Sequence, residues 1–246
     1  MNYLPHLKDY YEKIKELPLK TAYKREELII PEFLVEAEKE IGLYYCTHNE
    51  YVNPKAKVFI VGITPGFTQM SKSISTARAC IEENKSLEEI VYLCKKEGRL
   101  AGTLRKNVMD MLEALELPKG LGTQNAKALF DEREDLLHTT SMIPFAAFVK
   151  GKNYTGHSPQ LLKNDFLMSY VEAHFYPQIE LMQDALIIPL GRCVEEVIKC
   201  LIAEGKVDEN KCLLGFPHPS GANVNRKKQF EEEKEKLLIK VEQFCK

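Results

Sequence analysis

Short, mainly apolar runs recur along the chain, and they are separated by longer segments with a different spacing. The runs lie at 57–63, 136–143, 185–190 and 211–216. Runs of this length, rich in branched aliphatic residues, are typical of strands that are buried on both faces. The pattern therefore predicts four strands.

Between these runs, apolar residues recur every three or four positions. This spacing predicts helices at 6–17, 32–42, 75–97, 101–117 and 160–182, another after Gly191, and a C-terminal helix that begins at about 226. Strands that occur singly between helices pair in parallel. We therefore expect an α/β fold, a three-layer α/β/α sandwich around a central, mostly parallel, four-stranded sheet.

The chain has 246 residues, of which 44% are hydrophobic, and this is ample for one sizeable core. It contains no internal repeat, no low-complexity segment and no linker rich in proline or glycine. We expect one domain over residues 1–246, with residues 1–50 forming a helical N-terminal extension packed on it.

Composition also bounds the compartment and the cofactors. No apolar run approaches the roughly 18 residues that cross a bilayer, and the N-terminus lacks the apolar centre of a signal peptide. The seven cysteines are scattered, without a CxxC pair or a histidine at metal-ligand spacing. We expect a cytoplasmic monomer with free thiols, no membrane contact, no metal and no cofactor.

The formal net charge is −2, but the charge is unevenly distributed. Windows 51–81, 136–164 and 211–230 hold eleven lysines and arginines and no acidic residue, whereas the other positions hold 23 basic and 36 acidic residues. If these windows converge in space, they form an electropositive face that attracts a phosphate backbone. The alternative is chance combined with the low acid content of core strands.

Two short motifs stand where strands end. The string 62-GITPG-66 follows the run VFIV, and 218-HPSGAN-223 follows the run LLGF. Ligands of open α/β sheets bind outside the carboxyl ends of the strands, which here are followed by loops 62–74, 144–159, 191–193 and 217–225. Three of these four loops fall in the acid-free windows, so we expect the ligand face and the positive face to coincide.

These strings resemble the two motifs of the uracil-DNA glycosylase superfamily. GITPG is similar to the family's strand ending in G-x-(Asp, Asn or Ala)-P-(Gly or Tyr), in the GxNPG version of the mismatch-specific and single-strand-selective branches. HPSGAN matches the second motif, H-P-S followed by a small loop and a helix. Residues 186–198 are similar to the family's strand-LG-helix element, so the resemblance covers roughly 57–240.

The resemblance implies a hydrolase of base excision repair of DNA damage, which flips a damaged base out of DNA and hydrolyses its N-glycosidic bond. His218 would be the donor to the departing base. Thr64 stands where the most active branches carry Asp or Asn to position water, and a hydroxyl cannot act as a general base near neutral pH. We therefore expect a slow enzyme. It would be monofunctional, because neither motif holds a lysine for a Schiff base.

The resemblance also implies a pocket for uracil or another deaminated base. Phe67 stands where the family stacks an aromatic ring on the flipped base, and Thr140 and Ser141 end the second predicted strand where members carry an asparagine that reads uracil. The pocket residues expected on this basis are Gly62, Ile63, Pro65, Gly66, Phe67, Thr140 and Ser141.

The start of the C-terminal helix predicts a phosphate contact. Asn225, or Asn223 with Ser220, can cap this helix, and its first turn carries Arg226, Lys227 and Lys228. Cations there oppose the helix dipole unless an anion docks on them. We expect DNA contacts from Ser220, Gly221, Asn223, Arg226 and Lys227. The alternative is a solvated basic turn balanced by the glutamates that follow.

Two other functions stay open at this point. A catalytically degenerate member would bind damaged or single-stranded nucleic acid without cleavage, and an unrelated α/β protein would bind a small phosphorylated ligand at the same strand ends. The branch with an iron–sulfur cluster needs four cysteine ligands, two of them close together before the first motif. Only Cys46 lies there, so no cluster is expected.

Overall fold

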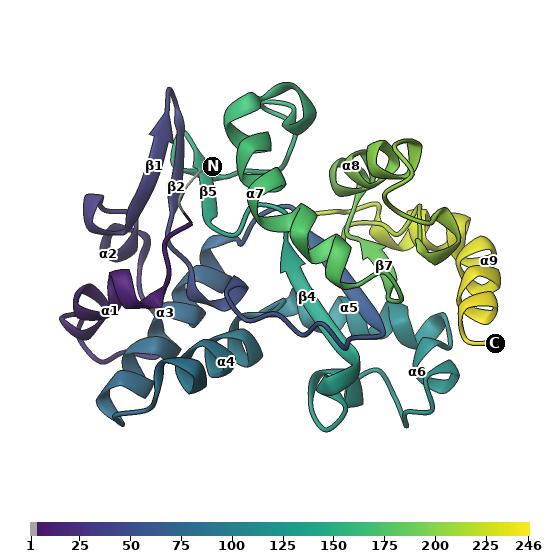
Figure 1. The fold of residues 1–246 in the computed structure, drawn as a ribbon, viewed down its shortest axis with the longest axis horizontal. Helices are drawn as coiled ribbons and strands as arrows, with labels where there is room; N and C mark the ends of the chain where they lie inside the picture. The colour runs from purple at the N-terminus through teal and green to yellow at the C-terminus, as the bar shows by residue number, and fades with distance from the viewer. Residues whose placement is uncertain (1–3) are drawn as a thin grey trace. The chain divides into compact units, whose positions relative to one another are not determined.

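The computed structural model describes residues 4–246, which form two compact units (Figure 1). Unit 1 contains the chain up to Val52, Thr64–Ala101 and Ser141–Phe175, and unit 2 contains Asn53–Ile63, Gly102–Thr140 and Tyr176–Lys246. Each unit is therefore assembled from three separate stretches of sequence. No helix within 4–246 is long and apolar enough to cross a membrane.

Unit 2 is built around a three-stranded sheet. Strand β3 (Val58–Gly62) pairs in parallel with β7 (Leu186–Pro189), and β4 (Leu137–Ser141) lies on the other side of β3. Every residue of these strands except Gly62 is buried. Burial on both faces explains why they read as apolar runs, and three of the four predicted strands are confirmed.

The fourth predicted strand, 211–216, is reduced to one isolated parallel bridge between Cys212 and Ile187. Gly215 then adopts a φ of +91°, and its N–H donates to the carboxylate of Glu195 at 2.6 Å instead of to a neighbouring strand. A left-handed residue cannot continue an extended ladder. The structure is thus a mixed α/β fold with three strands in this sheet, where we expected four.

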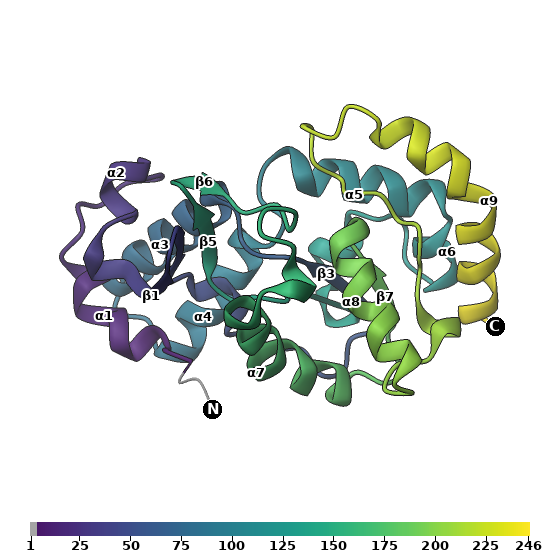
Figure 2. The ribbon, with the colours of Figure 1, turned by 90° about the horizontal axis from the view of Figure 1, so that it is seen from above.

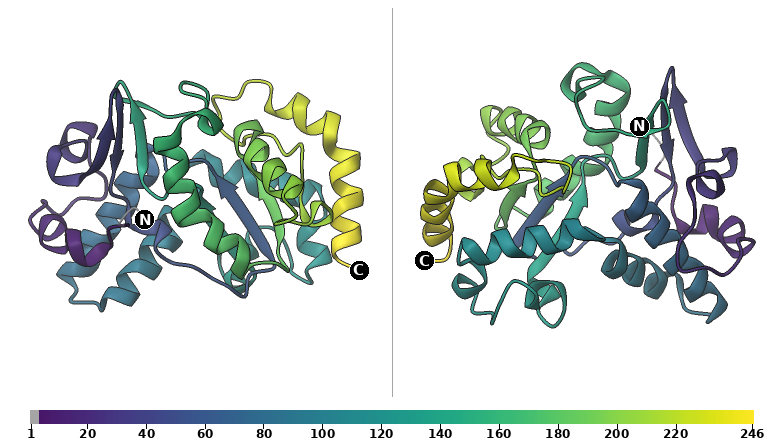
Figure 3. Two further views of the ribbon diagram at one scale, coloured as in Figure 1. Left: turned by 45° about the horizontal axis from the view of Figure 1, so that its top comes forward. Right: turned by 180° about the vertical axis from the view of Figure 1, so that it is seen from behind.

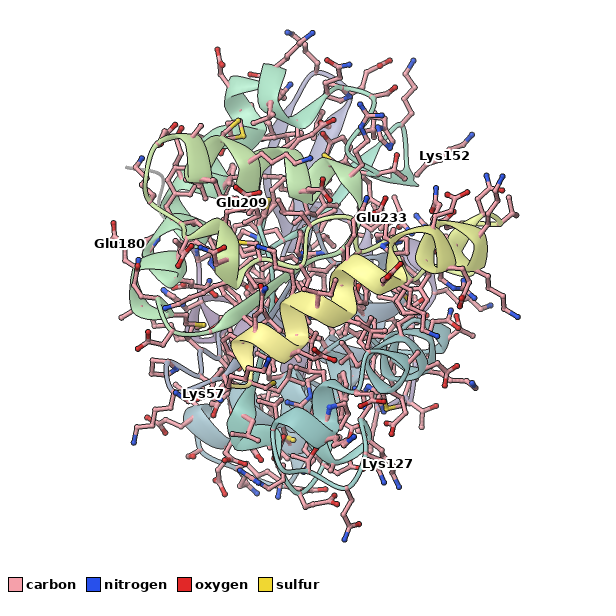
Figure 4. All side chains as sticks on the ribbon, turned by 90° about the vertical axis from the view of Figure 1, so that its right-hand side faces the viewer. Lys57, Lys127, Lys152, Glu180, Glu209 and Glu233 are labelled. Atoms are coloured by element: carbon pink, nitrogen blue, oxygen red, sulfur yellow. The ribbon has the colours of Figure 1, made fainter. Side chains whose placement is uncertain are left out.

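Helices cover both faces of the unit 2 sheet: α5 (Thr103–Ala114) lies on one side and α8 (Arg192–Ala203) on the other (Figure 1, Figure 2). Short α6 (Leu117–Gly120) follows α5. The terminal helix α9 (Arg226–Phe244) crosses the face shown in Figure 4, where Glu233 is labelled on it. It buries Phe230, Leu237 and Val241 against the unit, as its spacing predicts.

Unit 1 holds a separate antiparallel sheet of order β1-β2-β5-β6. Its strands are β1 (Leu34–Glu38), β2 (Ile41–Tyr44), β5 (Ala146–Val149) and β6 (Lys152–Asn153). The helix predicted at 32–42 is therefore wrong, because this segment forms the β1–β2 hairpin, which lies beside β5 (Figure 3). Pairing of β2 with β5, from Ile41 opposite Val149 to Tyr44 opposite Ala146, outweighs the helix-forming composition of EAEKE.

The helices of unit 1 are α1 (Leu7–Lys15), α2 (Arg25–Leu28), α3 (Phe67–Glu82) and α4 (Leu87–Gly98), and α7 (Asp165–Leu181) contributes its residues up to Phe175. The single helix predicted at 75–97 is two helices. Asn84 interrupts it with a φ of +54°, and the Ser86 hydroxyl accepts from the Glu89 N–H at 3.3 Å to start α4.

Single turns of 3-10 helix join the larger elements. They are η1 (Pro31–Phe33), η2 (Thr47–Asn49), η3 (Ala128–Phe130), η4 (Glu134–Leu136), η5 (Leu161–Lys163) and η6 (Glu209–Lys211).

Aromatic stacking and one carboxylate tie the N-terminal residues into unit 1. The rings of Tyr10 and Tyr45 stack with centroids 3.9 Å apart, and Tyr45 is fully buried. The Glu50 carboxylate accepts from the Tyr45 hydroxyl and, at 3.1 Å, from the Leu7 N–H that opens α1. Two donors and aromatic packing thus fix α1 against the rest of the unit.

Unit 1 also buries a lysine. Lys95 of α4 is only 3% exposed, and desolvation, with the nearby Arg99 cation, lowers the pKa of its amine to about 7. A buried amine loses its charge more readily than one in water. Between pH 7 and 10.5 the unfolded chain therefore holds a proton that the folded chain has released.

Loss of the α4 cap should destabilise the protein. We expect Ser86→Ala to lower the free energy of unfolding by about 1 kcal/mol, since the Glu89 N–H loses its acceptor. Urea denaturation measures the change. Ser86→Asp, which supplies another capping acceptor, should stay close to wild type, and an equal loss in both variants would show that the cap does not matter.

Lys95 should make stability depend on pH. Because the unfolded state binds the extra proton, the free energy of unfolding should rise from pH 7 to 8.5, by up to about 1.4 kcal/mol per pH unit. Urea denaturation at several pH values should show Lys95→Met lacking this rise. Exposed Lys15→Met should retain it, and an unchanged slope in Lys95→Met would contradict the assignment.

Candidate active site

His218 lies on the loop of unit 2 that leads into α9, two residues after Phe216. Its Nδ1 accepts a hydrogen bond from the Ser220 N–H at 3.2 Å. A neutral imidazole whose Nδ1 accepts carries its proton on Nε2. The side chain keeps solvent-accessible surface, and partial desolvation by the surrounding protein lowers its pKa. The ring therefore presents a neutral Nε2–H donor at physiological pH.

The loop that carries His218 is held by its backbone carbonyls. Three consecutive carbonyl oxygens each accept from a different side chain: that of His218 from Asn223 Nδ2 at 3.1 Å, that of Pro219 from Asn107 Nδ2 at 2.8 Å, and that of Ser220 from Arg226 Nη1 at 2.8 Å. Three such bonds restrict the rotation of successive peptide groups. The loop formed by the motif thus holds the imidazole in a fixed position.

Gly191, which follows β7 and is the N-cap residue of α8, makes room for His218. Its φ is +87°, and a Cβ built on it would lie 2.8 Å from His218 Cβ. Its N–H donates to the Phe216 carbonyl at 3.1 Å. The glycine of the family-like LG element is therefore required both by its left-handed backbone and by the close approach of motif two.

The start of α9 differs from the expected cap. Asn225 makes no side-chain cap bond, and Asn223 instead joins the His218 carbonyl to Gln229 Oε1, which lies 2.9 Å from its Nδ2. The Ser220 hydroxyl accepts from the Ala222 N–H at 3.2 Å. Gly221 and Lys227, also predicted to contact DNA, are exposed.

The first motif spans the end of one segment of unit 2 and the start of one segment of unit 1. Gly62 and Ile63 finish the β3 segment of unit 2, and Thr64 opens the next segment of unit 1. The Thr64 hydroxyl donates to the Phe145 carbonyl at 2.6 Å and accepts from the Ala147 N–H at 2.9 Å. A hydroxyl has one donor and two acceptor sites, so one acceptor site is left for water.

Phe67 begins α3 within a cluster that the sequence did not indicate. The Arg25 guanidinium lies 4.9 Å from the centre of its ring and donates to Asn153 Oδ1 at 2.9 Å. The same Oδ1 accepts from the Phe67 N–H at 3.3 Å, while the Gly66 N–H donates to Gln69 Oε1 at 3.1 Å. The backbone N–H groups of Gly66 and Phe67 are thus already engaged by side chains.

The other residues that the sequence predicts for the base pocket differ in exposure. Thr140 and Ser141, at the end of β4, are 6% and 5% exposed, and Pro65 is buried as well. Little of these side chains is available to a ligand. Gly62 and Ile63 keep intermediate exposure, as do Gly66 and Phe67.

The acid-free windows are not free of carboxylates in space. Five of their eleven basic residues pair with acids from elsewhere in the chain: Lys72 with Glu97, Arg78 with Glu82, Lys150 with Glu40, Lys211 with Asp184 and Lys228 with Glu232. A window drawn along the sequence overlooks such partners. The positive charge available to a phosphate backbone is therefore smaller than the sequence suggested.

Metal sites in proteins are built from several His, Cys, Asp or Glu side chains that lie close together. No group of three or more His, Cys, Asp or Glu residues within 4–246 could hold a metal ion.

Three residues that contact these motifs or belong to their loops were not predicted from the sequence. Asn107 and Arg25 reach their motifs from distant positions, and neither belongs to a recognisable motif. Val224, in the motif-two loop two residues before α9, is an aliphatic residue that is 88% exposed. Only the last could have been found, as the single branched apolar residue in the string GANVN.

Comparison with known proteins agrees with the two motifs. The family model described as "Uracil DNA glycosylase superfamily" matches residues 50–242. An uncharacterized protein of Bacillus subtilis, YoxB, is 38% identical over 240 residues, which cover 97% of this chain and 93% of that protein. No solved structure matches the chain. With its histidine loop, its glycine-flanked strand ends and this match over most of its length, the chain belongs to the uracil DNA glycosylase superfamily.

Proposed function

We propose that the protein is a monofunctional DNA glycosylase that flips uracil or another deaminated base out of DNA and hydrolyses its N-glycosidic bond. The observation that carries this proposal is the hydrogen bond from the Ser220 N–H to His218 Nδ1, which leaves an Nε2–H donor on the ring. Membership of the superfamily supports the same reaction class.

The chemistry follows from where charge develops. As the bond between the base nitrogen and sugar C1′ breaks, its electron pair stays on the base, and negative charge grows on a base oxygen. A fixed N–H donor at that oxygen lowers the barrier because it needs no reorientation when the charge appears. Water then adds to C1′, and the proton that it releases passes through solvent to the base anion, so that the products are a neutral base and an abasic sugar. His218 supplies the donor, and the three bonded carbonyls of its loop keep it aimed.

Thr64 is the proposed water-positioning residue. Its remaining acceptor site can take a hydrogen from the attacking water, which leaves the lone pairs of that water free. No carboxylate at this position removes the proton, so general-base assistance worth roughly 100-fold or more is missing. Slow turnover is the expected consequence.

The base and the DNA backbone are assigned to the other motif residues. Exposed parts of Gly62, Ile63 and Phe67 would meet the base, while Pro65, Gly66, Thr140 and Ser141 shape the backbone around it. Ser220, Gly221, Asn223, Arg226 and Lys227 would meet the DNA backbone. Exposed Val224 fits partial unstacking of a base step, for which DNA-bending proteins use apolar side chains.

A second candidate function is binding of damaged or single-stranded nucleic acid without cleavage. The observation that favours it is the engagement of the Thr64 hydroxyl by Phe145 and Ala147, since both a donor and an acceptor site are used by backbone. In this case the His218 loop would recognise a base oxygen without driving departure of the base.

Replacement of His218 tests the first candidate. Labelled oligonucleotides with one uracil, hypoxanthine or xanthine are incubated with protein and then treated with alkali to break abasic sites. We expect wild type to cleave at least one of them, and His218→Ala to lower the single-turnover rate by roughly 100- to 1,000-fold, as loss of one charge-stabilising donor does.

Exposed His157→Ala is the matched control and should act as wild type does. Tight, salt-sensitive binding by wild type with no breakage at any lesion would support the second candidate instead. No binding to any of these oligonucleotides at low salt would contradict both.

The approach of Gly191 to His218 gives a separate test. Gly191→Ala and Gly205→Ala both place a Cβ on a left-handed backbone, with φ +87° and +71°, but only the first meets His218. We expect Gly205→Ala to lose about 1 kcal/mol of stability, and Gly191→Ala to lose more, because its Cβ must also displace His218. Gly191→Ala alone should lose most of the excision activity, and equal activity in both would contradict the proposed role of the loop.

A further inference from the structure

We infer that Asn107, on α5, is the positioning residue that fixes the ring orientation and the tautomer of His218. The inference concerns unit 2 alone, and only its catalytic consequence rests on the proposed function. Nothing in the two motifs indicates this residue, because it lies more than 100 positions before the loop that it holds.

The argument begins with the peptide group between Pro219 and Ser220. A peptide group is planar, so the direction of its carbonyl fixes the direction of its N–H. The carbonyl oxygen of this group accepts from Asn107 Nδ2 at 2.8 Å, and its N–H donates to His218 Nδ1 at 3.2 Å. Asn107 and the imidazole therefore bind the two polar groups of one planar peptide group.

The other two side chains on the loop act mainly on different peptide groups. Asn223 Nδ2 donates to the carbonyl of His218, and Arg226 Nη1 donates to that of Ser220 at 2.8 Å. Arg226 Nη1 also reaches the Pro219 oxygen, but at 3.5 Å it restrains the plane that carries the Ser220 N–H far less than Asn107 Nδ2 does at 2.8 Å. Asn107 is also half-buried on a regular helix, which gives its amide a firmer base than a loop does.

Orientation of that plane has a chemical consequence. While the Ser220 N–H points at Nδ1, the neutral ring must keep its proton on Nε2. If the plane rotates, Nδ1 can carry the proton instead, and the ring then presents a lone pair where a donor is needed. Asn107 acts through another residue, so its loss should change the state of His218 before it changes the fold.

The experiment compares Asn107→Leu with wild type. Leucine has nearly the shape of asparagine but no donor. The tautomers are read from ¹⁵N NMR of the histidine side chains, in which the His218 signal is identified by its absence from His218→Gln. Wild type should show the Nε2–H tautomer. Asn107→Leu should show a mixture of tautomers. Lys106→Ala, the neighbouring exposed residue on α5, is the matched control and should keep the wild-type signal.

Catalysis gives the second readout. Single-turnover excision by Asn107→Leu should fall by about 10- to 100-fold, since misplacing a catalytic group by ~1 Å costs up to this much. Affinity for an uncleavable oligonucleotide should change by no more than about twofold. Where the leucine variant does not fold, Asn107→Ala is measured in its place, with thermal unfolding as the check.

The two readouts separate the two claims. Retention of a pure Nε2–H tautomer in a folded Asn107 variant would overturn the inference, whatever the activity, and so would its absence from wild type. If wild type excises no base but the Asn107 variant loses the tautomer, the proposed function fails and the positioning role stands.

Discussion

A single peptide group, between Pro219 and Ser220, connects the fold of unit 2 with the chemistry proposed for His218. Its carbonyl is held from helix α5 and its N–H holds the imidazole. The loop can reach this position because Gly191, between β7 and α8, has no side chain. Parallel pairing of β3 with β7, α5 on one face and the bridge at Cys212 together place these parts. The donor is thus built by the fold and not by the motif alone.

In the first motif, most polar groups bond to other parts of the protein and few remain for a ligand. Thr64 uses its hydroxyl to join the motif to β5, and Gly66 and Phe67 give their N–H groups to Gln69 and Asn153. Bonds of this kind stabilise a loop by satisfying its polar groups, but they leave fewer groups for water or base. A first motif whose polar groups are already bonded is consistent with the slow turnover proposed for this protein.

The sequence allowed prediction of what depends on local pattern. Buried strands β3, β4 and β7 appear as apolar runs, and helices α8 and α9 follow from their spacing. The β1–β2 hairpin was missed because its pairing with β5 joins positions about 100 residues apart. Asn107 and Arg25 were missed for the same reason, since only the folded chain brings them to the motifs. The positive charge of the acid-free windows was overestimated, because carboxylates from outside them, such as Glu97 and Glu40, pair with their lysines.

The central claim is that His218 presents an Nε2–H donor to a base taken out of DNA. It is tested most directly by a crystal structure of the protein with DNA that carries 2′-fluoro-deoxyuridine, whose electron-withdrawing fluorine slows departure of the base. The account predicts the uracil outside the base stack, with one of its oxygens 2.7–3.1 Å from His218 Nε2 and the Ser220 N–H still on Nδ1. A uracil that remains stacked, or a flipped base whose oxygens are bound elsewhere while Nε2 faces solvent, would contradict it.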